Sequence, residues 1–169
     1  IYSSKKLKNW TINFNSIFKY NMNTNISNNS ESLDGCVTIY ETEIEKIKLN
    51  IMNGVCEDSL NIVRSKGSIE KIYISNSFKD GLDMDFSNVK INEIKVDTSG
   101  NDCVDMSFGN YNIAILNLNK CKDNAVSIGE KSNLLSKNLY AKNSLNALAV
   151  KDSSKVSIKS LISKNNNFN

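Results

Sequence analysis

Three aspartates at related positions are the residues of this chain best suited to chemistry. Asp83 and Asp105 lie 22 residues apart, and Asp85 follows Asp83 by two residues. If each 22-residue stretch is one coil, the Cβ atoms of Asp83 and Asp105 lie about 5 Å apart, where two charges repel by about 1 kcal/mol in water. Oxygen clusters of this kind suit hard cations. The sequence therefore predicts weak Ca²⁺ binding at Asp83, Asp85 and Asp105, with solvated surface charge as the alternative.

The same spacing recurs through the middle of the chain and defines a repeat. A fixed period of about 20–50 residues indicates a solenoid. The opening residue of each repeat is a short polar one, and the five openings are Asp58, Asp80, Asp102, Asn124 and Asn146. A short polar side chain at the same turn of every coil is expected to hydrogen-bond the backbone of a neighbouring coil, because buried turn backbone needs partners. We therefore predict a structural ladder at these five positions.

Apolar and polar residues alternate inside each repeat, which is the pattern of a half-buried strand. The third and fifth positions form two apolar columns: Leu60, Leu82, Val104, Val126 and Leu148, then Ile62, Met84, Met106, Ile128 and Val150. A second apolar strand follows in each repeat, for example at Ile69, Ile72 and Ile74. Stacked coils bury these faces, and parallel strand connections take the right hand. The expected fold is all-β, a right-handed parallel β-helix with about 22 residues per coil.

The repeat also divides the chain. Residues 1–34 are the least regular and are rich in aromatic side chains, with five of the 13 in the chain, so we expect an irregular first coil or N-terminal cap there. Residues 35–169 are expected to form the β-helix coils. The last residues contain no apolar cap, and proteins normally block an exposed strand edge. We therefore expect this chain to be a segment of a longer protein.

Composition excludes several function classes. The net charge of +3 is small and evenly spread, which argues against a nucleic-acid partner. No apolar run approaches the roughly 18 residues of a membrane span, so no membrane insertion is expected. The chain has no His, which removes most nucleophile–base pairs and makes a zinc site improbable.

Four cysteines, Cys36, Cys56, Cys103 and Cys121, are distributed along the chain without a CxxC pair. Free Cys often serves as a small buried apolar residue. We expect that state for these four side chains, with one disulfide as the alternative.

The repeats resemble the right-handed β-helix repeat of the pectate-lyase-like superfamily, and the central coils resemble those of polygalacturonases. That family carries Asn-Thr-Asp-Gly, then Asp-Asp-Cys, then Gly-His-Gly, then Arg-Ile-Lys on successive coils. The corresponding stretches here are Phe78–Gly81, Asn101–Cys103, Asp123–Gly129 and Ala149–Lys151. The resemblance implies that Asp80 and Asp102 match catalytic aspartates. Asn124 stands in place of the family's His and Ala149 in place of its Arg.

Enzymatic and non-enzymatic functions both follow from this resemblance. Inverting hydrolases need one carboxylic acid and one carboxylate across the sugar bond, which makes Asp80 and Asp102 the candidate catalytic residues. Pectate-lyase-like enzymes are implied to combine Ca²⁺ on outward carboxylates with a basic residue, for which Arg64, Lys79 and Lys151 are the candidates. The absent His and Arg favour a segment without catalysis.

The function expected first is therefore a non-catalytic β-helix segment of a bacterial or phage surface protein, extracellular or on the cell surface. It would serve as a rigid scaffold or a glycan-facing platform, with a polysaccharide as partner. Rings for sugar contact would come from Tyr40, Tyr73 and Tyr111 if these point outward. The alternative is a carbohydrate-active enzyme, a polysaccharide lyase or glycoside hydrolase acting on acidic polysaccharide. A homotrimer is expected if the chain belongs to a phage spike.

Overall fold

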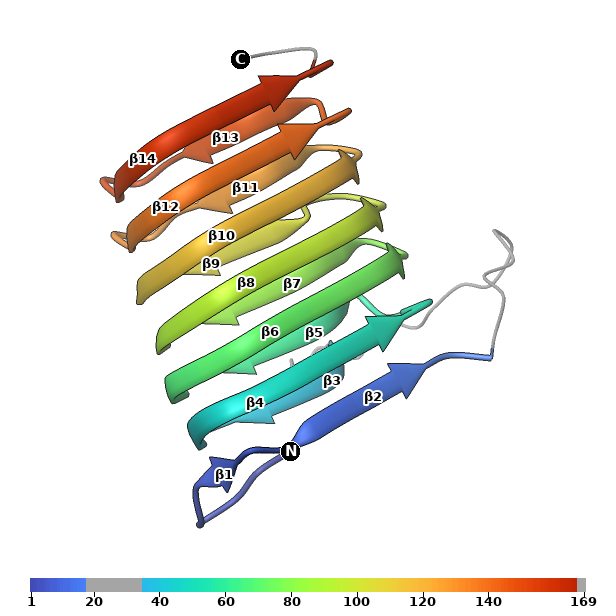
Figure 1. Cartoon of the computed structure of the whole chain (residues 1–169), viewed down its shortest axis with the longest axis vertical. Helices are drawn as coiled ribbons and strands as arrows, with labels where there is room; N and C mark the ends of the chain where they lie inside the picture. The colour runs from blue at the N-terminus through green and yellow to red at the C-terminus, as the bar shows by residue number, and fades with distance from the viewer. Residues whose placement is uncertain (18–34, 167–169) are drawn as a thin grey trace.

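The computed structural model describes residues 1–17 and 35–166, and this part of the chain is a parallel β-solenoid of about six turns without helix. Each turn contributes one strand to each of two sheets (Figure 1). The short-strand sheet contains β3 (Gly35–Tyr40), β5 (Asp58–Val63), β7 (Asp80–Asp85), β9 (Val104–Ser107), β11 (Asn124–Ile128) and β13 (Asn146–Val150). The long-strand sheet contains β4 (Glu43–Met52), β6 (Lys66–Ser77), β8 (Asn88–Ser99), β10 (Asn110–Cys121), β12 (Asn133–Lys142) and β14 (Lys155–Lys164).

The coil is right-handed. As the chain rises from the N-terminus to the C-terminus in Figure 1, the long strands in front run from left to right and the short strands behind run from right to left. Neighbouring strands in both sheets are parallel and pair residues one repeat apart, such as Leu82 with Val104 and Ile72 with Ile94. The predicted fold class is confirmed, and so is the register of the short strands.

The core is a narrow stack of aliphatic side chains between the two sheets. In the first predicted column, Leu60, Leu82, Val104 and Val126 are fully buried. Each is at 0% exposure because it is enclosed by the coils on both sides and by the facing long strands. Burial weakens towards the last coil, where Val150 is 48% exposed. Stacking, rather than any single coil, therefore supplies the apolar burial.

The chain turns twice per coil, and both corners use left-handed backbone. The first corner, from short to long strand, has positive φ at Glu41, Arg64, Phe86, Phe108, Glu130 and Asp152. The second corner, from long to short strand, has positive φ at Asn53, Asn76, Thr98, Lys120, Asn143 and Asn165. Asn tolerates this conformation better than other non-Gly residues, which explains its prevalence at the second corner.

The N-terminal residues extend the long-strand sheet. Two short strands, β1 (Leu7–Lys8) and β2 (Thr11–Asn15), both pair with β4. Leu7 joins the core and is 3% exposed. The remainder of the predicted irregular first coil or cap, residues 18–34, lies outside the described residues. Among the described residues there is no helix long and apolar enough to cross a membrane.

The expectation for the cysteines was wrong. All four are oxidised, and they form two disulfides, Cys36–Cys56 and Cys103–Cys121. The sequence separations are 20 and 18 residues, slightly less than one coil, so the chain returns to the same corner when the second Cys is reached. Two disulfides fit a secreted or extracellular protein, because such bonds persist in oxidising compartments.

Candidate functional site

The ladder residues lie at the start of the short strands and bond neighbouring coils. The Asp80 carboxylate accepts a hydrogen bond from the Asp102 N–H at 2.8 Å. The Asp102 carboxylate likewise accepts one from the Asn124 N–H at 2.8 Å, and another from the Asn124 side-chain amide. The Asn146 amide continues the series by donating to Asn124 Oδ1. At the other end of the series, Asp58 accepts a hydrogen bond within its own strand, from the Asn61 amide at 3.3 Å.

These hydrogen bonds fix the two carboxylates that match catalytic positions. Asp102 is 5% exposed, and burial raises the pKa of its carboxyl although the bonds from Asn124 oppose that change. Burial also raises the pKa of Asp80 to about 6, against the bond from the Asp102 N–H. Both side chains are therefore used by the backbone of the next coil.

The three predicted cation ligands, Asp83, Asp85 and Asp105, lie on the outer face of the short-strand sheet. Asp83 pairs in register with Asp105, and Asp85 lies two residues further along β7. Asp83 accepts a hydrogen bond from the Asn61 amide at 2.9 Å. Asp105 Oδ1 accepts one from the Met106 N–H at 2.9 Å. The strands thus bring the three side chains onto one half-buried surface.

A hydrogen bond between the Asp83 and Asp85 carboxyls relieves the repulsion between them. Burial, and then the nearby charge of Asp85, raises the pKa of Asp83 to about 9. The neutral Asp83 carboxyl donates a hydrogen bond to Asp85, whose own pKa is raised by burial in spite of that bond. At neutral pH the Asp83 carboxyl is therefore protonated.

Ca²⁺ binding at Asp83, Asp85 and Asp105 stays a prediction. No group of three or more His, Cys, Asp or Glu side chains is arranged to hold a metal ion within residues 1–17 and 35–166. The prediction treated the three carboxylates as equally ionised, whereas protonation of Asp83 removes one negative charge. A carboxyl that donates its proton to a neighbour is a poor ligand for a hard cation.

Unpaired oxygens lie on the same outer column as the acids. Strand pairing aligns Thr38, Asn61, Asp83, Asp105 and Ser127 across five coils. Within the described chain, the buried atoms Thr38 Oγ1, Asn61 Oδ1 and Ser127 Oγ have no hydrogen-bond partner. Ser127 is 0% exposed and Asn61 is 6% exposed. Each unpaired buried oxygen of this kind costs about 1–3 kcal/mol.

Two phenylalanines at the first corner border this surface and were not singled out from the sequence. Phe86 and Phe108 follow β7 and β9, and their rings stack with centroids 4.6 Å apart and an interplanar angle of 2°. They are 48% and 52% exposed. The Arg64 guanidinium lies 5.7 Å from the centre of the Phe86 ring. Their 22-residue spacing was the available signal, because like positions stack in a solenoid.

The basic candidates are poorly placed to remove a proton. The Lys79 ammonium contacts Glu57 at 2.6 Å, and this bond raises the pKa of Lys79. Arg64 contacts Glu41 at 3.7 Å and Tyr40 at 3.1 Å. A general base needs a lowered pKa, so neither contact assists a lyase reaction.

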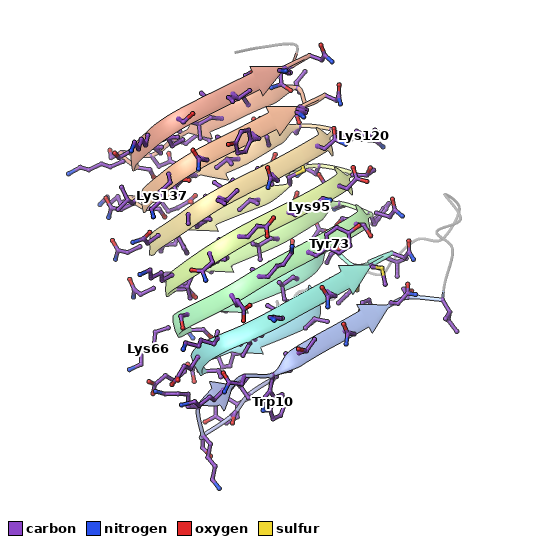
Figure 2. The ribbon with its side chains drawn as sticks, in the orientation of Figure 1. Trp10, Lys66, Tyr73, Lys95, Lys120 and Lys137 are labelled. Carbon is purple, nitrogen blue, oxygen red and sulfur yellow. A yellow bond between two sulfur atoms is a disulfide. The ribbon has the colours of Figure 1, made fainter. Side chains whose placement is uncertain are left out.

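The tyrosines divide between surface and core. Tyr73 lies on the outer face of the long-strand sheet with Lys95 nearby (Figure 2), and the Lys95 ammonium is 5.5 Å from its ring centre. Tyr40 is half-buried at the end of β3. Tyr111 does not offer a ring to sugar, because it points inward and is 2% exposed. Another outward tyrosine, Tyr140, lies in the same column of paired residues as Tyr73. It was not singled out from the sequence.

Comparison with protein-family models, with curated proteins and with solved structures found no match. The fold agrees with a β-helix, and the resemblance to pectate-lyase-like proteins rests on the repeat residues described above. The geometry establishes a parallel β-solenoid whose repeats bond to one another through polar ladders.

Proposed function

We propose that this protein is a rigid extracellular scaffold without a catalytic centre. The single observation that carries the proposal is the use of Asp80 and Asp102 as backbone partners of the next coil. A carboxylate held in this way serves coil stacking, and its bonds would have to break before it reached a substrate. One coil later, Asn124 Oδ1 accepts from the Asn146 side-chain amide, so a side chain that cannot ionise also bonds the next coil.

Cross-links and ladders support the scaffold role. The disulfides close loops within single coils, and both lie near the corner where long strands lead into short ones. Asn side chains bond in series along that corner, as between Asn53 and Asn76 and between Asn143 and Asn165. Regular bonding of each coil to the next gives a stiff rod, and oxidised cysteines suit an extracellular location.

Incubation with acidic polysaccharides tests the proposal directly. The protein is mixed with polygalacturonate, alginate and related polymers, with and without Ca²⁺, and new reducing ends and unsaturated sugars are measured over time. We expect neither product above the rate of a heat-denatured sample. Turnover that is lost in Asp80→Asn or Asp102→Asn would show that the ladder residues catalyse a reaction and would reject the scaffold proposal.

A glycoside hydrolase is the second candidate, because Asp83 and Asp105 place two carboxyls on neighbouring strands. Burial keeps Asp83 protonated at neutral pH, as a general acid requires, while the Asp105 carboxyl lies on the neighbouring strand. The unpaired oxygens of Asn61 and Ser127 flank this pair on the same column. Release of reducing ends by the parent, but not by Asp83→Asn, would establish this function in place of the first.

A further inference from the structure

A groove crosses the outer face of the long-strand sheet, on the side opposite the acid cluster. It spans β8, β10 and β12 and has a volume of about 550 Å³. Figure 2 views this face and shows Lys95 and Tyr73 side by side on adjacent long strands. Because the groove lies on regular strands, its shape is fixed by strand register rather than by loops.

Short side chains form the floor of this groove and long ones form its walls. Asn117 on β10 pairs with Lys95 on one side and Tyr140 on the other. Asn119 lies in the same way between Asp97 and Lys142. Two strand spacings, about 9.6 Å, separate the backbones of the two walls. An extended chain of small rings can therefore lie along β10, between the walls.

The floor and one wall offer unused hydrogen-bonding groups. The Asn119 amide is already occupied, since it donates to Asp97 at 2.7 Å and accepts from Asn143 at 2.8 Å. Asn117 makes only a long bond to Glu93, at 3.5 Å, through its amide nitrogen. Within the described residues, Asn117 Oδ1 and the Tyr140 hydroxyl have no hydrogen-bonding partner. Tyr140 is half-buried and adds an aromatic surface beside these polar atoms.

Charges in the groove cancel. Glu93 and Asp97 carry negative charge, and Lys95 and Lys142 carry positive charge. Glu93 is also paired with Lys71 at 2.9 Å, and Lys95 lies over the Tyr73 ring. A strongly anionic ligand such as a nucleic acid would need an excess of cations here. The groove instead suits a neutral ligand whose many hydroxyls can both donate and accept hydrogen bonds.

We propose that this groove binds a neutral polysaccharide chain, with the Tyr140 ring stacked against a sugar and Asn117 bonding its hydroxyls. The proposal goes beyond the scaffold function, because a scaffold need not bind any ligand. It also places the ligand on the long-strand sheet, away from Asp83 and Asp105.

Isothermal titration calorimetry with purified polymers tests the groove. The neutral probes are hydroxyethyl cellulose, xylan, galactomannan and laminarin, and the anionic probes are polygalacturonate and alginate. We expect at least one neutral polymer to bind, with a Kd that is the same at low and high salt. Tyr140→Ala should weaken that binding by about two- to tenfold, because it removes the aromatic contact with the sugar. Asn117→Arg should abolish it by filling the floor.

The matched control is Tyr40→Ala, which removes a ring from the other sheet and should leave Kd unchanged. Thermal melting of each variant verifies folding, and both groove positions are on the outer face, so their changes leave the core intact. Failure of every neutral polymer to bind would overturn the proposal. Binding that is equal in the parent and Tyr140→Ala, or that is confined to anionic polymers and is lost at high salt, would overturn it as well. None of these outcomes bears on the cleavage assay, so the scaffold proposal is tested separately.

Discussion

At the residue scale, the position of an aspartate in the coil decides its chemistry. Asp102, at the start of a strand, accepts two hydrogen bonds from Asn124 that favour its ionised form. Asp83, three residues into β7, lies beside other acids on a half-buried face that favours its neutral form. The sequence could place both residues by their repeat positions. It could not reveal that Asp83 is protonated, because the raised pKa of Asp83 depends on burial of the outer face of the short-strand sheet. The sequence predicted that this face is exposed to solvent.

The protonation of Asp83 predicts that stability falls as pH rises. Asp83 has a folded-state pKa of about 9, above the ordinary carboxyl value of about 4. Between these two pKa values the folded protein binds more protons than the unfolded chain. The stabilising contribution of Asp83 is therefore complete below about pH 4 and is lost as the pH rises to about 9. Melting temperatures measured from pH 5 to pH 9 should therefore decrease across the series.

Asp83→Asn should flatten that pH dependence and raise the melting temperature at pH 8, because an amide N–H can donate to Asp85 without a proton to lose. Each kcal/mol recovered corresponds to roughly 2–4 °C. Asp123→Asn, outside the cluster, is the matched control and should retain the slope of the parent. An unchanged slope in Asp83→Asn would show that the acid pair is not protonated.

The Tyr111 hydroxyl takes the place of a serine hydroxyl that is absent from the first corner of one coil. At the first corner, Ser87 accepts from the Ser65 N–H at 3.0 Å and donates to the Ile62 and Asp85 carbonyls. The next coil has Gly109 at this position. There the Tyr111 hydroxyl lies 2.7 Å from the Met84 carbonyl and 2.8 Å from the Ser107 carbonyl, and it accepts from the Ser87 N–H. The buried tyrosine thus replaces the missing hydroxyl.

Tyr111→Phe should cost about 1–3 kcal/mol of folding free energy, because it leaves these buried backbone groups without a partner. Chemical denaturation measures the loss. Tyr73→Phe makes the same change on the outer face and should cost less than about 0.5 kcal/mol. Equal losses for the two variants would mean that the Tyr111 hydroxyl has no special role.

At the element scale, each coil is two strands joined by two left-handed corners. Alternation of apolar residues predicted the short strands correctly, since one face of each is buried. The long strands were harder to predict, because in β12 both Leu134 and Leu135 are apolar. Leu134 points inward at 2% exposure, whereas Leu135 is 54% exposed. The pairing of β12 with β10 decides which of the two leucines points inward, and the sequence alone does not specify that pairing.

The second corner offers a stabilising substitution. Thr98 has φ 73°, a conformation that β-branched side chains resist, while Asn76 occupies the same position one coil earlier with φ 56°. Thr98→Asn should relieve that strain and allow an amide bond to Asn76, for a gain of about 1 kcal/mol. Denaturation midpoints measure the gain, with Thr98→Val as the control that keeps the branched side chain. A loss of stability in Thr98→Asn would contradict the corner assignment.

At the scale of the whole molecule, a solenoid has a long thin core, and cross-links add to its stability. The repeat period revealed this architecture because every coil imposes the same burial pattern. The disulfides could have been predicted once the coil length was known, since Cys103 and Cys121 are nearly one coil apart. The chemical properties of Cys alone favoured free thiols, so the error came from ignoring the geometry of the coil.

Removing the Cys103–Cys121 disulfide should destabilise the fold by about 3 kcal/mol, the value expected for closing a loop of roughly this length. The double variant Cys103→Ala/Cys121→Ala should accordingly melt on the order of 10 °C below the parent. Thiol titration of the unfolded parent, without reductant, should find no free thiol. Free thiols there, together with a variant that melts with the parent, would exclude the disulfide.

The account depends most on the structural role of the ladder aspartates, and Asp102 tests that role directly. Asp102→Asn retains an oxygen that accepts from the Asn124 N–H, and Asn already occupies the ladder at Asn124. Asp102→Ala removes the acceptor. Thermal and chemical unfolding at neutral pH should show Asp102→Asn within about 0.5 kcal/mol of the parent or more stable, because burial opposes the charge of Asp102. Asp102→Ala should lose about 1–3 kcal/mol. If Asp102→Ala is as stable as the parent, the ladder bond is absent and the scaffold account is contradicted.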